Sequence, residues 1–505
     1  MNILLLLVTS ILFSSCGDDN FNASDTPLGK IPTPSEPDAF EIEGNIEFAP
    51  TVDKESILRN PCTGWVLYDD ANMEVANAET YWAKQDQYAK YASIFYVRWR
   101  WSEMEPEEGK YAWEHNENYK RLIQGALDRG LKLAFRVYND ASSNIRSSTP
   151  LFVREAGAEG TMLGEGNDKR WTPYEDDPVF QQKLSNFVRA FGREYDDPSK
   201  VDFIDAVNLG TWGECHHMIM KSEKNDVTKG VLLEWITNLY GSSFRRVPLV
   251  MPINSDFGNT AEMNIAKARY GYNFRRDGLG SLWFYPDEKK VVEKLYGKSL
   301  LIGETCYWGG DQTDNLWFDD SAYHFTTWRE IYQVTFKDAT EYHFNTLDLR
   351  TPVETQRWLT KAPDVVQKFI EVGGYRLYPD AISYPETMTV GETYSIGHRW
   401  VNLATGFFPN SDQRWNFKYR VALALISGDE VKKVVVDSQT DPSQFLQNKP
   451  VTYTTKLSTE GIEPGEYTLA IAIVDTTDDN KPGIKLATKN EQIKGWTKLV
   501  GIEVK

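Results

Sequence analysis

HNENYKRLIQGALDRGLKLAFRVYN, residues 115–139, predicts a helix that runs directly into a buried strand. Residues 115–130 are compatible with an amphipathic helix, and Gly130 is of the residue type that commonly ends one. Residues 131–139 form a mainly apolar run of strand length. A helix that feeds a strand in this way is half of the repeating unit of an α/β fold.

Similar units recur on both sides of this stretch. Helical spacing of apolar residues appears at 177–195 and 226–244. Eight strand–helix units over residues 46–372 predict a (β/α)8 TIM barrel, which needs about 250 residues plus insertions. A doubly wound open sheet is the alternative, but no GxGxxG follows the first predicted strand. The predicted strands are 64–70, 93–101, 131–139, 203–214, 247–255, 269–277, 299–308 and 340–349.

The pattern changes near residue 373. Short strand-like runs such as FKYRVALALIS (417–427) and EYTLAIAIVDT (466–476) are separated by turn residues, with no amphipathic helix between them. This is typical of an all-β sandwich, which we predict for residues 373–505. We expect this domain to support the barrel, and carbohydrate binding is its alternative role.

The N-terminus predicts export from the cytoplasm. MNILLLLVTSILFSSC (1–16) is an apolar run that ends in small residues and Cys16, and it resembles a lipoprotein signal peptide with Cys16 in the lipobox. The GDDN that follows resembles a surface-export signal, so we expect an outer-membrane lipoprotein exposed at the cell surface. An ordinary secretory signal peptide, with a periplasmic or secreted product, is the alternative. Residues 17–45 are polar and Pro-rich and predict a flexible tether.

The amino-acid composition narrows the classes of ligand that we expect this protein to bind. A net charge of -18 argues against a nucleic-acid-binding protein. The 16 tryptophans provide flat apolar surfaces of the kind that sugar-binding clefts use. Cys62, Cys215 and Cys306 remain if Cys16 carries lipid, and an odd number is no disulfide framework.

Two glutamates carry the functional prediction. Glu214 ends the fourth predicted strand run, in VNLGTWGE (207–214), and Glu304 lies in the seventh, in SLLIGETCYW (299–308). A parallel barrel brings the ends of its strands to one face, where its catalytic groups lie. Two carboxyl groups there can cleave a glycosidic bond, because one protonates the leaving oxygen while the other attacks or activates water. A separation of about 5–5.5 Å retains the anomeric configuration, and about 6.5–9.5 Å inverts it.

This arrangement resembles the clan of retaining (β/α)8 glycoside hydrolases, which place the acid/base Glu after strand four and the nucleophile after strand seven. FYVRWRWSEMEPEEGKYAWEHNE (95–117) is similar to a segment found in several families of that clan. The chain also resembles a group of secreted bacterial barrel proteins of unknown function. Their shared features are an Asn-Pro-x-x-Gly-Trp start (Asn60 to Trp65), a Gly-x-Trp-Gly-Glu motif (Gly210 to Glu214) and a β-rich C-terminal part.

Further site residues follow from the predicted strand ends. Arg98 is placed to pair with the nucleophile carboxylate and keep it ionised. Helix capping or barrel packing is the alternative role for the other candidates. No metal or organic cofactor is expected, since HExxH is absent and the adjacent His216 and His217 project to opposite sides of a strand. The other candidate substrate-binding residues are Asn139, Asn208, Trp212, His216, Asn254, Asp256, Arg275, Asp277, Tyr307, Trp308 and His343.

We therefore predict a retaining glycoside hydrolase that acts on a poly- or oligosaccharide at the cell surface and meets the membrane only through its lipid anchor. The clan carries Asn immediately before the acid/base Glu, and this chain has Gly213 there. Asn208, on the same strand face by parity, is the imperfect substitute. This departure keeps a second hypothesis open, a non-catalytic carbohydrate-binding lipoprotein on a degenerate barrel. A structural or adhesion lipoprotein without a sugar site is the third.

Overall fold

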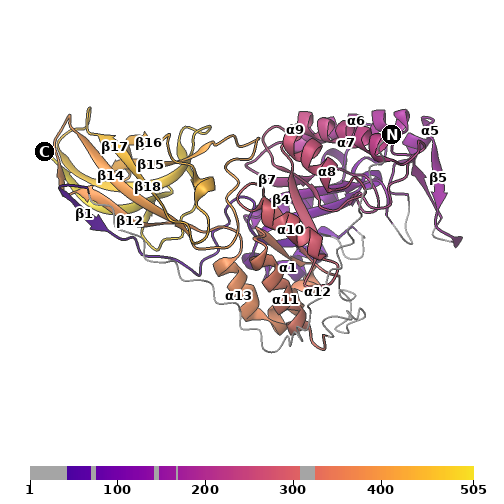
Figure 1. Cartoon of the computed structure of the whole chain (residues 1–505), viewed down its shortest axis with the longest axis horizontal. Helices are drawn as coiled ribbons and strands as arrows, with labels where there is room; N and C mark the ends of the chain where they lie inside the picture. Colours follow the sequence, from indigo (N-terminus) through magenta and orange to yellow (C-terminus); the bar gives the residue numbers. More distant parts are fainter. Residues whose placement is uncertain (1–41, 70–74, 142–146, 167–168, 308–324) are drawn as a thin grey trace, which may run out of the picture.

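A computed structural model describes residues 42–69, 75–141, 147–166, 169–307 and 325–505. Eight parallel strands close into a barrel in the order β10-β11-β2-β3-β4-β7-β8-β9, which confirms the predicted TIM barrel (Figure 1). Each barrel strand coincides with one of the eight predicted runs, although most are shorter. They are β2 (Gly64–Tyr68), β3 (Ala92–Arg100), β4 (Lys132–Tyr138), β7 (Val201–Asp205), β8 (Leu249–Pro252), β9 (Asn273–Leu279), β10 (Leu301–Thr305) and β11 (Thr346–Arg350).

Helices surround the barrel, and local sequence explains where they begin and end. α4 (Glu117–Asp128) begins after Asn116, whose side chain accepts a hydrogen bond from the Tyr119 N–H, and Gly130 follows its end with φ +69°. The other helices are α1 (Ala78–Gln85), α2 (Trp101–Met104), α3 (Ala112–His115), α5 (Leu151–Glu155), α6 (Pro178–Tyr195), α7 (Asp226–Ser243), α8 (Asn259–Ala261), α9 (Ala268–Tyr270), α10 (Pro286–Leu295), α11 (Trp328–Glu341), α12 (Pro352–Lys361) and α13 (Pro363–Val372).

The apolar stripe predicted on α6 packs against the outside of the barrel. Asp177 caps this helix by accepting hydrogen bonds from the N–H groups of Val179 and Phe180. Phe180, Leu184, Phe187, Val188 and Phe191 are all fully buried in one hydrophobic cluster with the outer faces of the strands. No helix in the described ranges is long and apolar enough to cross a membrane.

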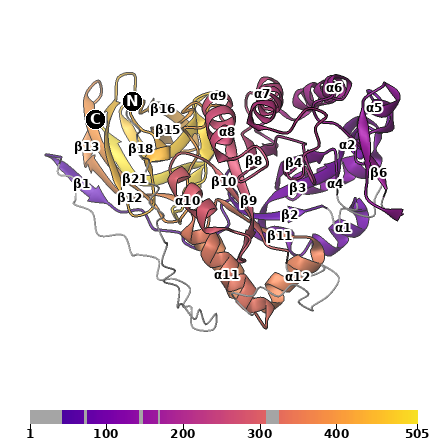
Figure 2. The same ribbon diagram turned by 45° about the vertical axis from the view of Figure 1, so that its right-hand side comes forward.

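The C-terminal region forms two antiparallel sheets, which agrees with the predicted sandwich (Figure 2). β1 (Asn45–Phe48), β12 (Leu377–Pro385), β14 (Thr393–Asn402) and β17 (Val451–Ser458) make one sheet. The second contains β13 (Thr387–Met388), β15 (Tyr419–Ser427), β16 (Glu430–Val436), β18 (Gly465–Asp475), β19 (Lys481–Ile484), β20 (Gln492–Ile493) and β21 (Trp496–Val504). The structure differs from the expected boundary at residue 46, because β1 pairs with β12 and so belongs to the sandwich.

The sandwich packs against the N-terminal end of the barrel. Asn345, just before β11, donates hydrogen bonds to the carbonyls of Cys62 and Phe407. His343 stacks on Tyr296 with ring centroids 3.6 Å apart, and its Nδ1 lies 2.7 Å from the Thr405 carbonyl. The opposite, C-terminal end of the strands is therefore the end that the sandwich leaves available for a site.

The loop from Asp140 to Asp176 contains a hairpin at this C-terminal end. Its strands β5 (Gly160–Leu163) and β6 (Arg170–Pro173) are antiparallel, and α5 precedes them. In both views the hairpin stands at the edge of the barrel farthest from the sandwich (Figures 1 and 2).

Candidate active site

The structure brings Glu214 and Glu304 together at the C-terminal end of the barrel. Glu304 lies within β10, the seventh barrel strand, whereas Glu214 lies nine positions beyond the end of β7, the fourth. The guanidinium of Arg275 contacts both carboxylates, Oε1 of Glu214 at 3.4 Å and Oε2 of Glu304. Arg136 spans the same two groups, at 2.7 Å from Glu214 and 3.7 Å from Glu304. The two carboxylates are therefore close enough for one guanidinium group to contact both.

A carboxylate below the pair fixes both bridging arginines. Oδ2 of Asp205, the last residue of β7, lies 2.7 Å from Nε of Arg136 and 3.3 Å from Nε of Arg275. The Tyr96 hydroxyl donates to the same oxygen at 3.0 Å. Arg136 and Asp205 are register partners on adjacent strands, so the barrel's own pairing aligns them. The guanidinium ends are thereby directed at the glutamates.

Glu304 is surrounded by four guanidinium groups. In addition to the bridging pair, its Oε1 lies 3.1 Å from Arg98 and 3.5 Å from Arg350. Burial on its own would raise the pKa of Glu304, but Arg275, Arg98, Arg136 and Arg350 outweigh it and hold the pKa well below its usual range. Glu304 is therefore an ionised carboxylate, and Arg98 has the contact predicted from the sequence.

Glu214 is held in a tight turn between β7 and α7. Thr211 and His216 pair across this turn, and Thr211 also bridges to Asp140 after β4. Gly210 and Gly213 both have φ +70°, and non-glycine residues including Trp212 and Cys215 are left-handed as well. Such conformations cost energy in a non-glycine residue and persist where the surroundings enforce them. The turn thus places Glu214 by backbone geometry rather than by strand position.

The same geometry explains why Gly213 stands where the resembled clan carries Asn. A Cβ at Gly213 would lie 3.1 Å from Cβ of Tyr138, a closer approach than most side chains accept. Asn208 does not take over the missing role. It is fully buried, and its Oδ1 accepts a hydrogen bond from the Tyr240 hydroxyl of α7. The proposed substitution of Asn208 for the clan's asparagine is therefore wrong, because its side chain is committed to the helix layer.

Several other predicted residues lie near the pair. Trp212 and His216 flank Glu214 and are half-buried. Tyr307 is 37% exposed, and the Arg350 guanidinium lies 5.8 Å from its ring centroid. Asp277 forms an ion pair with its neighbour Arg276 at the end of β9. These residues come from the turn after β7, from β9 and from the segment just after β10.

Most of the remaining predicted residues bind other groups of the protein. The Asn254 amide donates to Glu288 of α10 at 2.6 Å, and Asp256 accepts the Met218 N–H at 3.1 Å and pairs with Lys224. Asn139 is buried beside Glu175. The prediction that His343 binds substrate is wrong, because β11 starts only at Thr346 and His343 faces the sandwich. Trp308 and Cys16 lie outside the described residues.

Sequence reasoning missed Arg136, Arg350 and Asp205. Each is one of two charged residues in a short, largely apolar strand run, in LKLAFRV (131–137), TLDLR (346–350) and VDFID (201–205). Arg136 is the register partner of Arg98, so strand alignment would have placed both in one layer of the barrel interior. The alignment of β3 with β4 is the signal that could have identified Arg136, and the sequence of a single strand does not give it.

In the described part of the chain no three His, Cys, Asp or Glu side chains converge as metal ligands. Cys62, Cys215 and Cys306 are buried thiols, and burial raises the pKa of Cys62 and of Cys215 well above the usual value. The chemistry that the site offers is that of carboxylates and guanidinium groups.

No family model and no curated protein matches this chain. Similar solved structures include the catalytic domain of a beta-amylase from Paenibacillus polymyxa, at 8% identity and TM-score 0.37, covering 60% of this chain and 99% of that one. The exo-beta-1,4-mannosidase Op5Man5 from Opitutaceae bacterium strain TAV5 is 11% identical with TM-score 0.38, over 63% and 58%. Endo-glycoceramidase II from Rhodococcus sp. is 13% identical with TM-score 0.41, over 81% and 100%. All three are glycosidases, but similarity this distant carries no functional argument.

Proposed function

We propose that this protein is a glycoside hydrolase of the retaining type, with Glu304 as nucleophile and Glu214 as acid/base. The observation that carries the proposal is a pair of carboxylates, Glu304 in strand seven and Glu214 in the turn after strand four, both in contact with Arg275. Two carboxylates that one guanidinium touches favour the short separation of retaining enzymes. The sequence resemblance to the retaining clan assigns the same two positions.

The arginine contacts of each glutamate distinguish the two catalytic roles. Glu304, surrounded by four guanidinium groups, supplies the anionic oxygen that attacks the anomeric carbon. Glu214 uses Oε1 for its ion pairs, and its Oε2 has no partner among the described residues. That oxygen is the one available to deliver a proton to the leaving group.

The proposed reaction proceeds in two displacements. In the first, a Glu304 oxygen bonds to the anomeric carbon while the glycosidic C–O bond breaks, and Glu214 gives its proton to the departing oxygen. In the second, Glu214 takes a proton from water, the water oxygen bonds to the anomeric carbon, and the ester to Glu304 breaks. The sugar is released with its original configuration and both side chains return to their starting state.

A screen of chromogenic glycosides tests this proposal. Wild type should hydrolyse at least one substrate, and Glu304→Ala should abolish its turnover, with azide restoring reaction as a glycosyl azide of inverted configuration. Glu214→Ala should keep activity only on substrates with very acidic leaving groups. Glu262→Gln, a buried carboxyl in the helical turn between α8 and α9, is the matched control and should retain activity. The proposal fails if no glycoside distinguishes wild type from Glu304→Ala.

One observation favours a non-catalytic carbohydrate-binding protein as the second candidate. Arginines occupy both oxygens of Glu304 and Oε1 of Glu214, and the two residues are only 6% and 7% exposed. Such a network of buried ion pairs also suits the rigid base of a binding site. Glycan binding that Glu304→Ala leaves unchanged, without turnover by wild type, would select this function.

We also propose that Cys16 anchors the protein to the outer membrane, on the strength of the apolar run and small residues before it. Incorporation of labelled palmitate that Cys16→Ser abolishes would support the anchor. Proteolysis of intact cells distinguishes the outer surface from the periplasm.

A further inference from the structure

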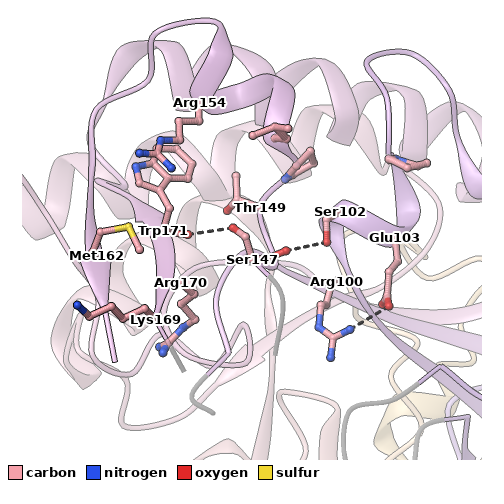
Figure 3. A pocket seen from close by; sticks show the side chains of 13 residues that line it. Arg100, Ser102, Glu103, Ser147, Thr149, Arg154, Met162, Lys169, Arg170 and Trp171 are labelled. Carbon is pink, nitrogen blue, oxygen red and sulfur yellow. Dashed lines mark hydrogen bonds and ion pairs between the residues drawn. The ribbon is translucent and has the colours of Figure 1, made fainter. Parts of the chain in front are cut away.

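A cavity lies beside the candidate active site. It has a volume of about 520 Å³ and is formed by α2, α5 and the β5–β6 hairpin (Figure 3). Arg100, at the end of β3, is part of its wall. Arg100 lies two positions beyond Arg98, which contacts Glu304, and two strand residues span about 7 Å. The cavity wall and the contact to the nucleophile therefore come from neighbouring positions of one strand, Arg100 and Arg98.

The cavity is also coupled to the turn that carries Glu214. Asp140 accepts two hydrogen bonds from the Arg170 guanidinium of the cavity wall, at 2.7 and 3.1 Å. The carbonyl of the same Asp140 accepts the Trp212 N–H at 2.9 Å. One residue thus links the cavity to the active-site turn.

The wall of the cavity is preformed. The Ser147 hydroxyl donates to the Trp171 carbonyl at 2.9 Å, and the Ser102 hydroxyl donates to the Ser147 carbonyl at 3.0 Å (Figure 3). These bonds join the hairpin, the loop before α5 and the start of α2. A ligand would meet this wall without first having to order it.

The charged residues on this wall are mostly cations. Arg100, Arg154, Lys169 and Arg170 line the cavity with one carboxylate, Glu103. Arg100 pairs with Glu103 at 2.9 Å and Arg170 with Asp140. Exposed Arg154 and Lys169, by contrast, pair with no carboxylate of the described residues. On a chain with a net charge of -18, two cations in one cavity that no described carboxylate pairs with select for an anionic ligand.

An aromatic ring lies beside these cations. The Arg154 guanidinium stands 5.6 Å from the ring centroid of Trp171, which is half-buried in β6 (Figure 3). Leu151 and Met162, 64% and 51% exposed, complete an apolar rim. A flat ring next to a guanidinium fits a ligand with an apolar face and an anionic edge, which is the chemistry of an acidic sugar.

We propose that this cavity is a subsite for an acidic sugar unit, carrying a carboxylate or a sulfate, of the saccharide that occupies the Glu214–Glu304 site. Arg154 and Lys169 bind the anionic group, and Trp171 supports the face of the ring. As a statement about one continuous saccharide the inference rests on the proposed function, but acid selectivity at the cavity can be measured separately.

Calorimetric titration of the full chain tests the subsite with matched ligands. Oligogalacturonates are compared with their neutral methyl esters, and sulfated galactan oligosaccharides with their desulfated forms. At least one acidic ligand should bind about tenfold or more tightly than its neutral partner, because a charge-assisted hydrogen bond contributes that much. The preferred pair identifies the anion as carboxylate or sulfate.

The double variant Arg154→Gln/Lys169→Gln should abolish this preference while leaving affinity for the neutral form unchanged. Lys449→Gln, an exposed lysine of the sandwich, is the control and should retain the preference. Equal binding of acidic and neutral ligands, or a preference that survives the double variant, overturns the subsite. Acid selectivity without turnover of any glycoside would refute the hydrolase and leave the subsite standing. Turnover of a glycoside without acid selectivity would refute the subsite and leave the hydrolase standing.

Discussion

Replacing Arg275 with methionine removes the cation that bridges the two glutamates. Arg275 contacts Asp205, Glu214 and Glu304, so the variant leaves three buried carboxylates with one guanidinium fewer. Breaking a buried ion pair costs about 3–5 kcal/mol. Because Arg136 contacts the same three carboxylates, we expect the lower figure, about 3 kcal/mol. For a barrel of roughly 310 residues that is a fall of about 4–5 °C in Tm.

The loss should depend on pH in a defined direction. Glu304 has a folded-state pKa below the ordinary 4.5, so its ion pairs stabilise the fold above pH 4.5 and that stability disappears as the pH falls through the folded pKa. Arg275→Met reduces the depression of the pKa. Its destabilisation should therefore be complete at pH 7 and shrink as the pH falls below about 4.5.

Calorimetric unfolding at a series of pH values measures both effects. Arg269→Met is the matched control, because Arg269 forms an exposed pair with Glu234, and such pairs contribute about 0–1 kcal/mol. The double variant Arg275→Met/Glu304→Gln should be less destabilised than the sum of its parts, since the removed charges are partners. Additive losses, or a loss that grows toward low pH, would refute the account of the site as a coupled charge cluster.

Three further predictions concern the groups around this cluster. Gly213→Ala should cost about 1–2 kcal/mol from its left-handed backbone and more from the approach to Tyr138, whereas Gly428→Ala, left-handed but facing open space, should show the backbone cost alone in urea unfolding. Burial raises the pKa of Glu175 to about 8. The stability that its protonated form contributes is complete below about pH 4.5 and is lost as the pH rises to 8, by at most about 1.4 kcal/mol per pH unit. Glu175→Gln should flatten this part of the plot of unfolding free energy against pH. Tyr240→Phe leaves the buried Asn208 oxygen without its donor and should cost about 1–3 kcal/mol, with glycan affinity unchanged in titrations; a change in affinity would return Asn208 to the site.

The barrel and its two glutamates were predictable because each depends on local patterns. The run LKLAFRVYN and its neighbours identify strands by apolar content alone, and counting them places Glu214 and Glu304 at strands four and seven. The turn that holds Glu214 was not predictable. The predicted strand ran to residue 214, whereas β7 ends at Asp205. Several residues of the segment 208–217 have positive φ, and Thr211 within it bridges to Asp140, which follows β4. A contact between segments so far apart in the chain does not show in either segment alone.

The energetics of the cluster bear on whether it serves stability or chemistry. Asp205, Glu214 and Glu304 surround the bridging arginines, and Asp348 pairs with Arg350. Buried ion pairs of this kind usually contribute little net stability compared with apolar packing. The turn at Glu214 adds left-handed backbone at Trp212 and Cys215, which costs more. A barrel selected for stability alone would fill this layer with apolar side chains, as it does with Phe95 and Phe135 on the outer faces of the same strands. The charged cluster stabilises the fold little, and the backbone of the turn costs energy, so both are better explained by a ligand or a reaction at the mouth of the barrel. Comparing Glu304→Ala with wild type on glycosides decides between ligand binding and reaction.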